Sequence, residues 1–163
     1  MKRLILLIFT LVPLFVSAQI PLIEQLGSVA SKQKGVEHQS VGSVLLGMAA
    51  TFAPKEQRET YKMLEHVTMI ECRNKEYTST LKQQALSSIN RIGAQYLTTM
   101  ADGRGSNDAY IVKQGDIVKH LIIITHGVNG GLAVIAMSGE IPFERLGEIS
   151  KLQPPGAAKK PKL

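Results

Sequence analysis

Residues 117–138 read IVKHLIIITHGVNGGLAVIAMS. The stretch contains two apolar segments of strand length, Ile117–Thr125 and Leu132–Ser138. Between them lies Asn129-Gly130, a dipeptide that favours a tight hairpin turn because both residues tolerate positive φ. We therefore expect a pair of antiparallel strands at the centre of a sheet, buried on both faces.

Two further strands are expected just before this hairpin. Tyr96–Ala101 and Ala109–Lys113 have strand periodicity, and the polar segment Asp102–Asp108 between them is expected to form a loop. A turn at Gln114-Gly115-Asp116 leads into the hairpin. Because sequential strands joined by short turns are antiparallel, the C-terminal half predicts a meander.

Helical periodicity marks four other segments. Their apolar stripes are Leu22, Ile23, Leu26, Val29 and Ala30; Leu45, Met48, Ala49 and Phe52; Leu81, Ala85, Ile89 and Ile92; and Phe143, Leu146 and Ile149. Pro54 is expected to end the second helix, Thr78 or Ser79 to cap the third, and Pro142 to open the last. Each stripe predicts the helix face that packs on the sheet.

Two strands and a charged segment separate the first three helices. Val36–Val41 alternates apolar and polar residues, and Val67–Cys72 is a compact apolar run. Lys55–Met63 is expected to add one or two helical turns. Strand-helix-strand passages require crossovers, so the sequence predicts an α+β fold with a single mixed, mostly antiparallel sheet covered by helices.

The first 18 residues have the features of a secretory signal peptide. Lys2 and Arg3 precede the apolar run Leu4–Val16, and small residues end the segment at Ala18. We expect cleavage between Ala18 and Gln19 and a soluble periplasmic or secreted product. The glutamine after the cut, where a lipoprotein has cysteine, argues against a lipid anchor. Neither apolar block of residues 117–138 approaches the roughly 20 residues of a transmembrane helix.

Most of the positive charge lies at the ends of the chain. The formal net charge is +6, and it falls to +1 for residues 19–152 once five terminal charges are removed: Lys2, Arg3, Lys159, Lys160 and Lys162. This body, which we expect to be one domain, has no basic excess for binding nucleic acid. The tail at residues 153–163 is expected to be disordered, and its three lysines offer only weak contact with an anionic membrane surface, about 1 kcal/mol each.

The histidines do not form a recognisable metal motif. His120 and His126 are six residues apart on one predicted strand, about 20 Å, which is too far to share an ion. His66 and His38 remain geometrically open as partners, but no metalloprotease spacing accompanies them. We expect solvated or strand-end histidines and no metal.

Three other features have a structural explanation that outweighs a catalytic one. Cys72, the only cysteine, follows Glu71 with no sign of a nucleophile elbow, so a buried thiol is expected. Gly127–Gly131 lacks the lysine and helix of a phosphate loop. Asp102, Asn107 and Asp108 offer oxygen ligands for calcium, but without the glutamate of an EF-hand loop. No catalytic residue, cofactor or metal ligand is expected.

The chain as a whole resembles a known family. Its N-terminal helix, its strand before a Met- and Phe-containing helix, the Asp102-Gly103 turn and the closing Gly139-Glu-Ile-Pro-Phe-Glu-Arg-Leu146 are similar to the exported bacterial family catalogued as domain of unknown function 4252. The resemblance covers roughly residues 19–152. It implies a small periplasmic or surface protein without established activity, often a lipoprotein and in some cases encoded near sigma and anti-sigma regulators. This chain differs in lacking the lipobox cysteine and in its basic tail.

These observations favour an exported, non-catalytic binding or interaction module whose partner is an envelope protein or a small ligand. One alternative is a small enzyme whose site the fold assembles from His66, His120, Cys72 and Glu71. Another is a self-associating subunit that pairs through Ile117–Thr125 or Leu132–Ser138, if either lies at a sheet edge. An apolar pocket would indicate a ligand, and an exposed apolar patch a protein partner.

Overall fold

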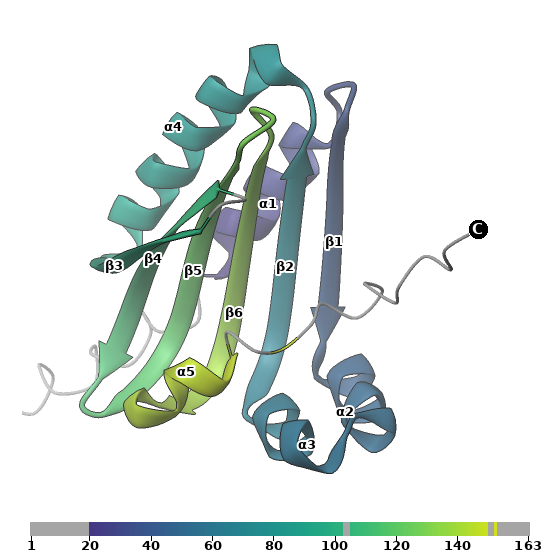
Figure 1. The fold of residues 1–163 in the computed structure, drawn as a ribbon, viewed down its shortest axis with the longest axis vertical. Helices are drawn as coiled ribbons and strands as arrows, with labels where there is room; N and C mark the ends of the chain where they lie inside the picture. Colours follow the sequence, from purple (N-terminus) through teal and green to yellow (C-terminus); the bar gives the residue numbers. More distant parts are fainter. Residues whose placement is uncertain (1–19, 103–104, 150–151, 153–163) are drawn as a thin grey trace, which may run out of the picture.

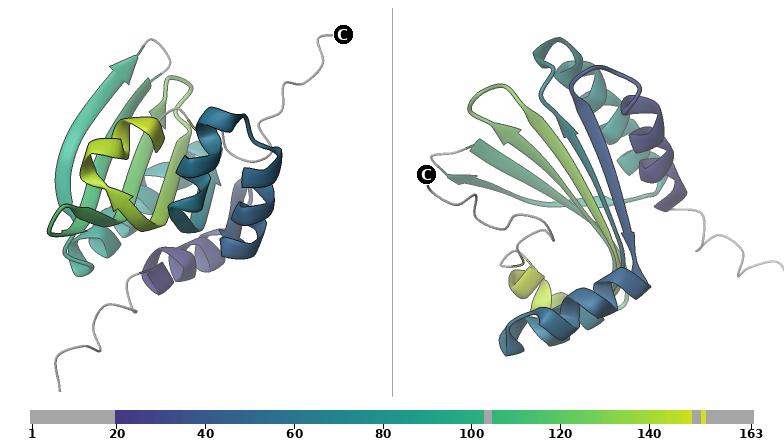
Figure 2. Two further views of the ribbon diagram at one scale, coloured as in Figure 1. Left: turned by 90° about the horizontal axis from the view of Figure 1, so that it is seen from below. Right: turned by 90° about the vertical axis from the view of Figure 1, so that its right-hand side faces the viewer.

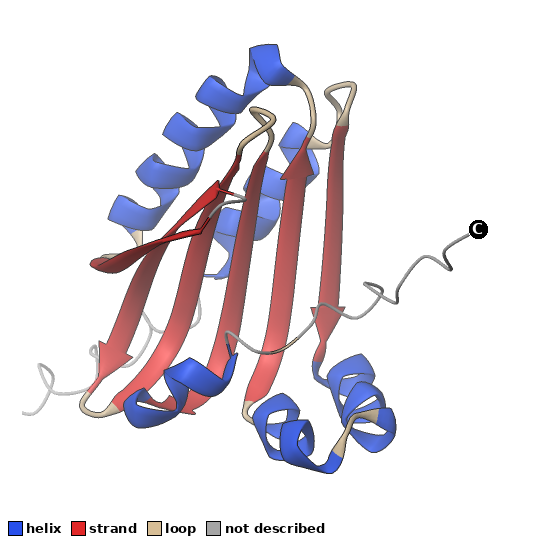
Figure 3. Cartoon of the chain, in the orientation of Figure 1, coloured by secondary structure: helices blue, strands red, loops and turns tan. Residues whose placement is uncertain are grey.

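A computed structural model describes residues 20–102, 105–149 and 152 of the 163-residue chain. The helices are α1 (Ile20–Ala30), α2 (Ser43–Phe52), α3 (Lys55–Lys62), α4 (Lys75–Arg91) and α5 (Leu146–Ile149), with a 3-10 turn η1 (Phe143–Arg145). The strands are β1 (Val36–Gly42), β2 (Leu64–Cys72), β3 (Gln95–Asp102), β4 (Gly105–Gln114), β5 (Ile117–Gly127) and β6 (Leu132–Pro142). Figures 1 and 3 show these elements. The expected signal peptide and basic tail lie outside the described residues.

The six strands form one sheet in the order β1-β2-β6-β5-β4-β3. All five pairings are antiparallel, so the α+β class and the C-terminal meander are confirmed and the sheet is antiparallel throughout rather than mixed. The β5-β6 hairpin lies at the centre, as residues 117–138 predict. Helices α2 and α3 link the neighbours β1 and β2 at one end of the sheet, whereas α4 runs from β2 to the far edge strand β3 (Figure 1).

Helices α1 and α4 cover one face of the sheet, which we call the closed face (Figure 2, right). Side chains on this face include Ile70, Ile124 and Val134, all fully buried. They pack against α1 through Ile23 and against the α4 stripe, whose Leu81, Ala85 and Ile89 are buried as expected. The larger of the two apolar cores therefore lies between the sheet and these two helices.

A glycine allows α1 to approach the sheet closely. The backbone of Gly27 lies against the imidazole of His38 on β1, and a β carbon at residue 27 would collide with that ring. The side chain of His38 is thereby held against α1, where its Nε2 is buried without a hydrogen-bond partner among the described residues. This close contact explains why a helix carries glycine at residue 27, although glycine has a low helix propensity.

The opposite face, the open face, is covered only at one end. There α2, α3 and α5 enclose a second core that includes Leu46, Val118, Ile141 and Ile149. Beyond these helices, Ile123 and Ile135 of the central strands are half-buried. The expectation that β5 and β6 are buried on both faces therefore holds at one end of the sheet and fails at the other.

The orientation of α2 differs from the expected one. The stripe of Leu45, Met48 and Phe52 was expected to pack on the sheet, but Leu46 and Ala50 are the buried residues of this helix. Phe52 is 85% exposed and Leu45 56% exposed. The helix is apolar nearly all round, so its periodicity alone does not select one face.

Three local expectations are corrected. Helix α4 begins four or five residues earlier than a cap at Thr78 or Ser79 predicts, because the Asn74 side chain accepts a hydrogen bond from the Glu76 N–H at 3.1 Å and caps it. The expected loop at residues 102–108 is largely strand, since β4 begins at Gly105. The closing helix forms only at Leu146, and Phe143 stays 44% exposed with the Lys113 ammonium 5.4 Å from its ring centroid.

Gly139, part of the closing segment that carried the family resemblance, lies where β6 meets the start of β2. A β carbon there would collide with the Met63 carbonyl oxygen, which accepts a hydrogen bond from the Glu140 N–H at 3.1 Å. The pairing of β2 with β6 is irregular next to this contact. None of the described helices is both long and apolar enough to cross a membrane.

Candidate functional site

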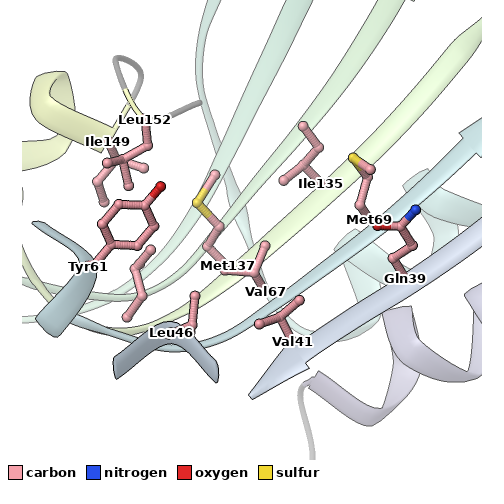
Figure 4. A pocket seen from close by; sticks show the side chains of 11 residues that line it. Gln39, Val41, Leu46, Tyr61, Val67, Met69, Ile135, Met137, Ile149 and Leu152 are labelled. Atoms are coloured by element: carbon pink, nitrogen blue, oxygen red, sulfur yellow. The ribbon is translucent and has the colours of Figure 1, made fainter. Parts of the chain in front are cut away.

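The open face carries an apolar pocket at the boundary of the second core. Its floor is formed by β1, β2 and β6, and its wall by residues of α2, α3 and α5 together with Leu152. The lining side chains are Gln39, Val41, Leu46, Tyr61, Leu64, Val67, Met69, Ile135, Met137, Ile149 and Leu152. Figure 4 shows Tyr61 and Ile149 at one end and Met69 and Gln39 at the other. We call this hollow the apolar pocket.

The register of the sheet places these side chains on one face. Met69 is paired with both Gln39 and Ile135, and Val67 is paired with both Val41 and Met137. The pairs form two rows of three residues that cross from the edge strand β1 through β2 to β6. Within each row, neighbouring residues lie on adjacent strands and are separated by one inter-strand distance. The helices close one end of these rows and leave the other open.

The pocket is suited to a small, uncharged, apolar group. Nine of its eleven lining side chains are apolar, and Gln39 and Tyr61 supply the only polar side chains of the lining. Its cavity volume is about 90 Å³, whereas one water molecule needs roughly 10–15 Å³ by the same measure. It holds the equivalent of one aliphatic or aromatic side chain, and no charged group lines it to bind an ionic substrate.

A polar cluster lies on the closed face, beneath α1. The hydroxyl of Ser40 is 3.2 Å from Glu24 Oε1 and 2.8 Å from His66 Nε2. Ser138 is the register partner of both His66 and His120 on its two neighbouring strands. All three line a second cavity of about 10 Å³, enough for one water molecule.

The hydrogen-bond directions in this cluster do not suit nucleophilic catalysis. A serine hydroxyl has one proton, and while Glu24 is ionised Ser40 donates that proton to the carboxylate. His66 must then donate to Ser40, whereas a general base has to accept the serine proton. Glu24, Ser40 and His66 are the residue types of a catalytic triad, but here the serine lies between the carboxylate and the histidine. In a catalytic triad the histidine lies between the other two, so this arrangement does not activate the Ser40 hydroxyl.

Burial governs the chemistry of the deeper part of the cluster. Desolvation, with a smaller contribution from Lys119, lowers the pKa of His120 below its ordinary value and keeps the imidazole neutral. The hydroxyl of Ser138, only 3% exposed, has no hydrogen-bond partner among the described residues. A single internal water in the second cavity would satisfy it.

The remaining candidates are not brought together. Cys72 is buried at the far end of β2, where its thiol donates to the Asn74 carbonyl oxygen at 3.4 Å. Glu71 lies on the open face and binds Arg73 at 2.9 Å. Two of the four residues considered for a fold-assembled enzyme, His66 and His120, therefore share a cavity, and the other two do not join them.

The possible calcium and histidine ligands are also dispersed. Asn107 and Asp108 are consecutive residues of β4 and so face opposite sides of the sheet. Asp108 accepts a hydrogen bond from Thr99 at 2.5 Å and lies 3.3 Å from His126 Nε2. No group of three or more His, Cys, Asp or Glu side chains suited to a metal ion occurs within the described ranges.

Sequence reasoning did not anticipate the apolar pocket. A signal for it exists in β2 and β6, which carry apolar residues in both phases of their alternation, such as Met69 beside Ile70. Strands of this kind need cover on both faces, and the long helices suffice for only one. An excess of apolar strand surface over helix stripes therefore predicts an uncovered apolar area, although not its position.

Comparison with known proteins identifies one family. None of the curated proteins and none of the solved structures matches the chain. The family model for a domain of unknown function (DUF4252) matches residues 30–149, which includes all six strands of the sheet. The chain therefore belongs to the family catalogued as domain of unknown function 4252.

Proposed function

We propose that this protein is an exported envelope protein whose domain is a non-catalytic binding module, and that the apolar pocket is its binding site. The observation that carries the proposal is an apolar hollow left open in a fold whose other face is closed. Concave apolar sites of this kind are where ligands or anchoring side chains bind. Its lining favours an uncharged aliphatic or aromatic group.

The export part of the proposal rests on the sequence of residues 1–18. A basic start, an apolar run and the residues three and one before the cut, Val16 and Ala18, are the features that signal peptidase recognises. We infer cleavage before Gln19 and a periplasmic or secreted mature protein. The mature N-terminus would then lie directly before α1.

A fold-assembled enzyme site is a second candidate, since His66 and His120 line one cavity with Ser138. The direction of the Ser40 hydrogen bonds and the one-water size of that cavity argue against it. Hydrolysis of an activated ester that is lost in Ser40→Ala would favour this candidate over the binding module. An assembly subunit would have to use β1 or β3, because β5 and β6 each have a neighbour on both sides.

The binding proposal is tested with methionine methyl groups as reporters. Met69 and Met137 line the apolar pocket, whereas Met48 and Met100 are exposed elsewhere. With the methyl groups labelled with carbon-13, 1-hexanol is added as an apolar probe and the methyl resonances are followed by NMR. We expect saturable shifts at the two pocket methionines and none at the two exposed ones.

A pair of variants makes the test specific. Ile135→Phe fills the pocket from β6 and is expected to abolish the shifts. Thr125→Phe places the same ring on the open face of β5, outside the lining, and is expected to leave them intact. The proposal would be overturned if the methyl resonances of Met69 and Met137 did not move at high 1-hexanol concentration. It would also be overturned if the two variants lost the shifts to the same extent.

A further inference from the structure

The two edges of the sheet differ in how they are protected. The pairing of β3 with β4 is interrupted by a bulge between Tyr96 and Thr98, and each of the three central pairings also has a register shift. The pairing of β1 with β2 is regular over all seven residues. Edge strands are commonly protected by bulges, prolines or lysines, and β1, with the sequence VEHQSVG, has none of these.

The edge of β1 is open to an incoming strand. Among the described residues, β2 is the only strand that pairs with β1. Figure 2 (right) shows β1 along the near side of the sheet, with α1 to its right on the closed face and α2 at its lower end. Alternate residues of such a strand direct their N–H and C=O groups outward, and these groups can bind another backbone.

The apolar pocket reaches this edge. Gln39 and Val41 of β1 are both part of its lining, so no further strand separates the hollow from the edge. A strand added to β1 would lie about 4.8 Å away, with the side chains opposite Gln39 and Val41 on the open face. A long apolar side chain at one of those positions can lean over β1 into the pocket.

The charges at the other end of β1 select the chemistry of such a strand. Glu37 and Glu71 are directly opposite each other on the open face. They share one guanidinium, with Arg73 2.9 Å from Glu71 but 3.8 Å from Glu37. Two carboxylates and one cation leave a net negative charge, so a basic side chain opposite Glu37 would complete the cluster.

We propose that the β1 edge and the apolar pocket together bind an extended polypeptide segment as a seventh strand, one that carries an apolar side chain two or four residues from a lysine or arginine. This inference rests on the proposed function, because the apolar side chain uses the same pocket. The main-chain hydrogen bonds supply affinity, and the pocket and Glu37 supply selectivity for side chains. Residues opposite Glu37, Gln39 and Val41 are two apart, which sets the spacing.

A second copy of this chain does not fit the edge as well. In a two-fold pairing of β1 with β1, the residues that reach the open face are again Glu37, Gln39 and Val41. They provide no basic side chain for Glu37 and no long apolar side chain for the pocket. The occupant that satisfies both features is a different polypeptide.

The experiment uses two capped synthetic peptides, Thr-Leu-Thr-Leu-Thr-Lys-Thr and its reversal, which cover antiparallel and parallel addition. Binding to the full domain is measured by the NMR shifts of Met69 and Met137 and by hydrogen exchange of the β1 amides. We expect pocket shifts together with new protection in β1. Versions of the peptides that are N-methylated at alternate residues keep the side chains but lose main-chain donors, and should bind at least about tenfold more weakly.

Charge exchange tests the role of Glu37. The variant Glu37→Lys should bind the lysine peptide about threefold more weakly than the unchanged protein does. A peptide with glutamate in place of lysine should bind this variant about threefold more tightly than the lysine peptide does. Equal binding of the N-methylated peptides, or pocket shifts without protection of β1, would overturn the seventh strand while leaving the pocket as a binding site. Binding of 1-hexanol with no binding of either peptide would do the same. If neither the probe nor the peptides bind, the proposed function fails as well.

Discussion

The two faces of the sheet are made from similar apolar side chains but are covered to different extents. On the closed face, α1 and the 17-residue α4 lie along the strands and bury Ile70, Ile124 and Val134 completely. On the open face, three short helices gather at one end, and the apolar pocket lies where their cover stops. The closed face holds the larger buried core, and the open face retains apolar surface that its helices cover only in part.

The largest expected effect compares adjacent residues of β5. Ile124→Ala on the closed face should lower the free energy of unfolding by about 3–4 kcal/mol, because a fully buried side chain leaves a cavity. Ile123→Ala on the half-buried open face should cost about 1–2 kcal/mol. Urea unfolding of both variants measures the difference. Equal losses would mean that the open face is covered in solution, contrary to the comparison.

A second comparison uses glycines in a helix on each face. Gly27→Ala should destabilise the domain by about 1–2 kcal/mol, because the new methyl group displaces His38 and lifts α1 from β1. Gly47→Ala in α2 meets no atom within 4 Å and should stabilise by up to about 1 kcal/mol through helix propensity. Thermal unfolding gives both signs. A neutral Gly27→Ala would show that α1 packs less closely than described.

The pH dependence of stability reports on burial of the closed face. The pKa of His120 is lowered in the folded state, so the unfolded chain binds the proton more readily. The stability from this group is complete above its ordinary pKa of 6.5 and is lost as pH falls below it toward the lower folded value. The urea concentration at the unfolding midpoint should therefore decrease as the pH is lowered from about 7.5 to about 5.5, and the decrease should be smaller in the His120→Gln variant. An identical slope in the variant would place the titrating group elsewhere.

The smallest expected effect concerns the outward side of α2. Phe52→Ser should change the free energy of unfolding by no more than about 0.5 kcal/mol, because that ring is largely in solvent. Leu46→Ala on the same helix is the control and should cost about 2–4 kcal/mol. A large loss in Phe52→Ser would restore the orientation that the Leu45 stripe predicts and would remove Leu46 from the pocket lining.

The sequence predicted the elements well where a single signal dominated. The hairpin of residues 117–138 follows from two apolar runs around Asn129-Gly130, and the α4 stripe from Leu81, Ala85 and Ile89 is buried as expected. Prediction failed where two signals competed. Asn74 competed with Thr78 and Ser79 as a cap, and α2 is apolar on several sides, so only packing against the sheet selects Leu46.

The candidate site was outside the reach of such reasoning. The apolar pocket draws its lining from three strands, three helices and Leu152, and no segment of the chain contains more than a few of these residues. The cluster around Ser40 likewise joins Glu24, His66 and Ser138 from separate elements. Only the register of the sheet brings the residues of each set together, and no motif or spacing in the sequence links them.

Local patterns therefore sufficed for the class of fold, the central hairpin and the expectation of export, because periodicity, turn chemistry and end charges are properties of short segments. The cover of each face, the regular edge at β1 and the pocket beside it depend on strand order and on where the helices end. These features depend on contacts between residues far apart in the sequence. The apolar area of the two sheet faces exceeds the area that the helices can cover, and in this protein part of the open face remains uncovered.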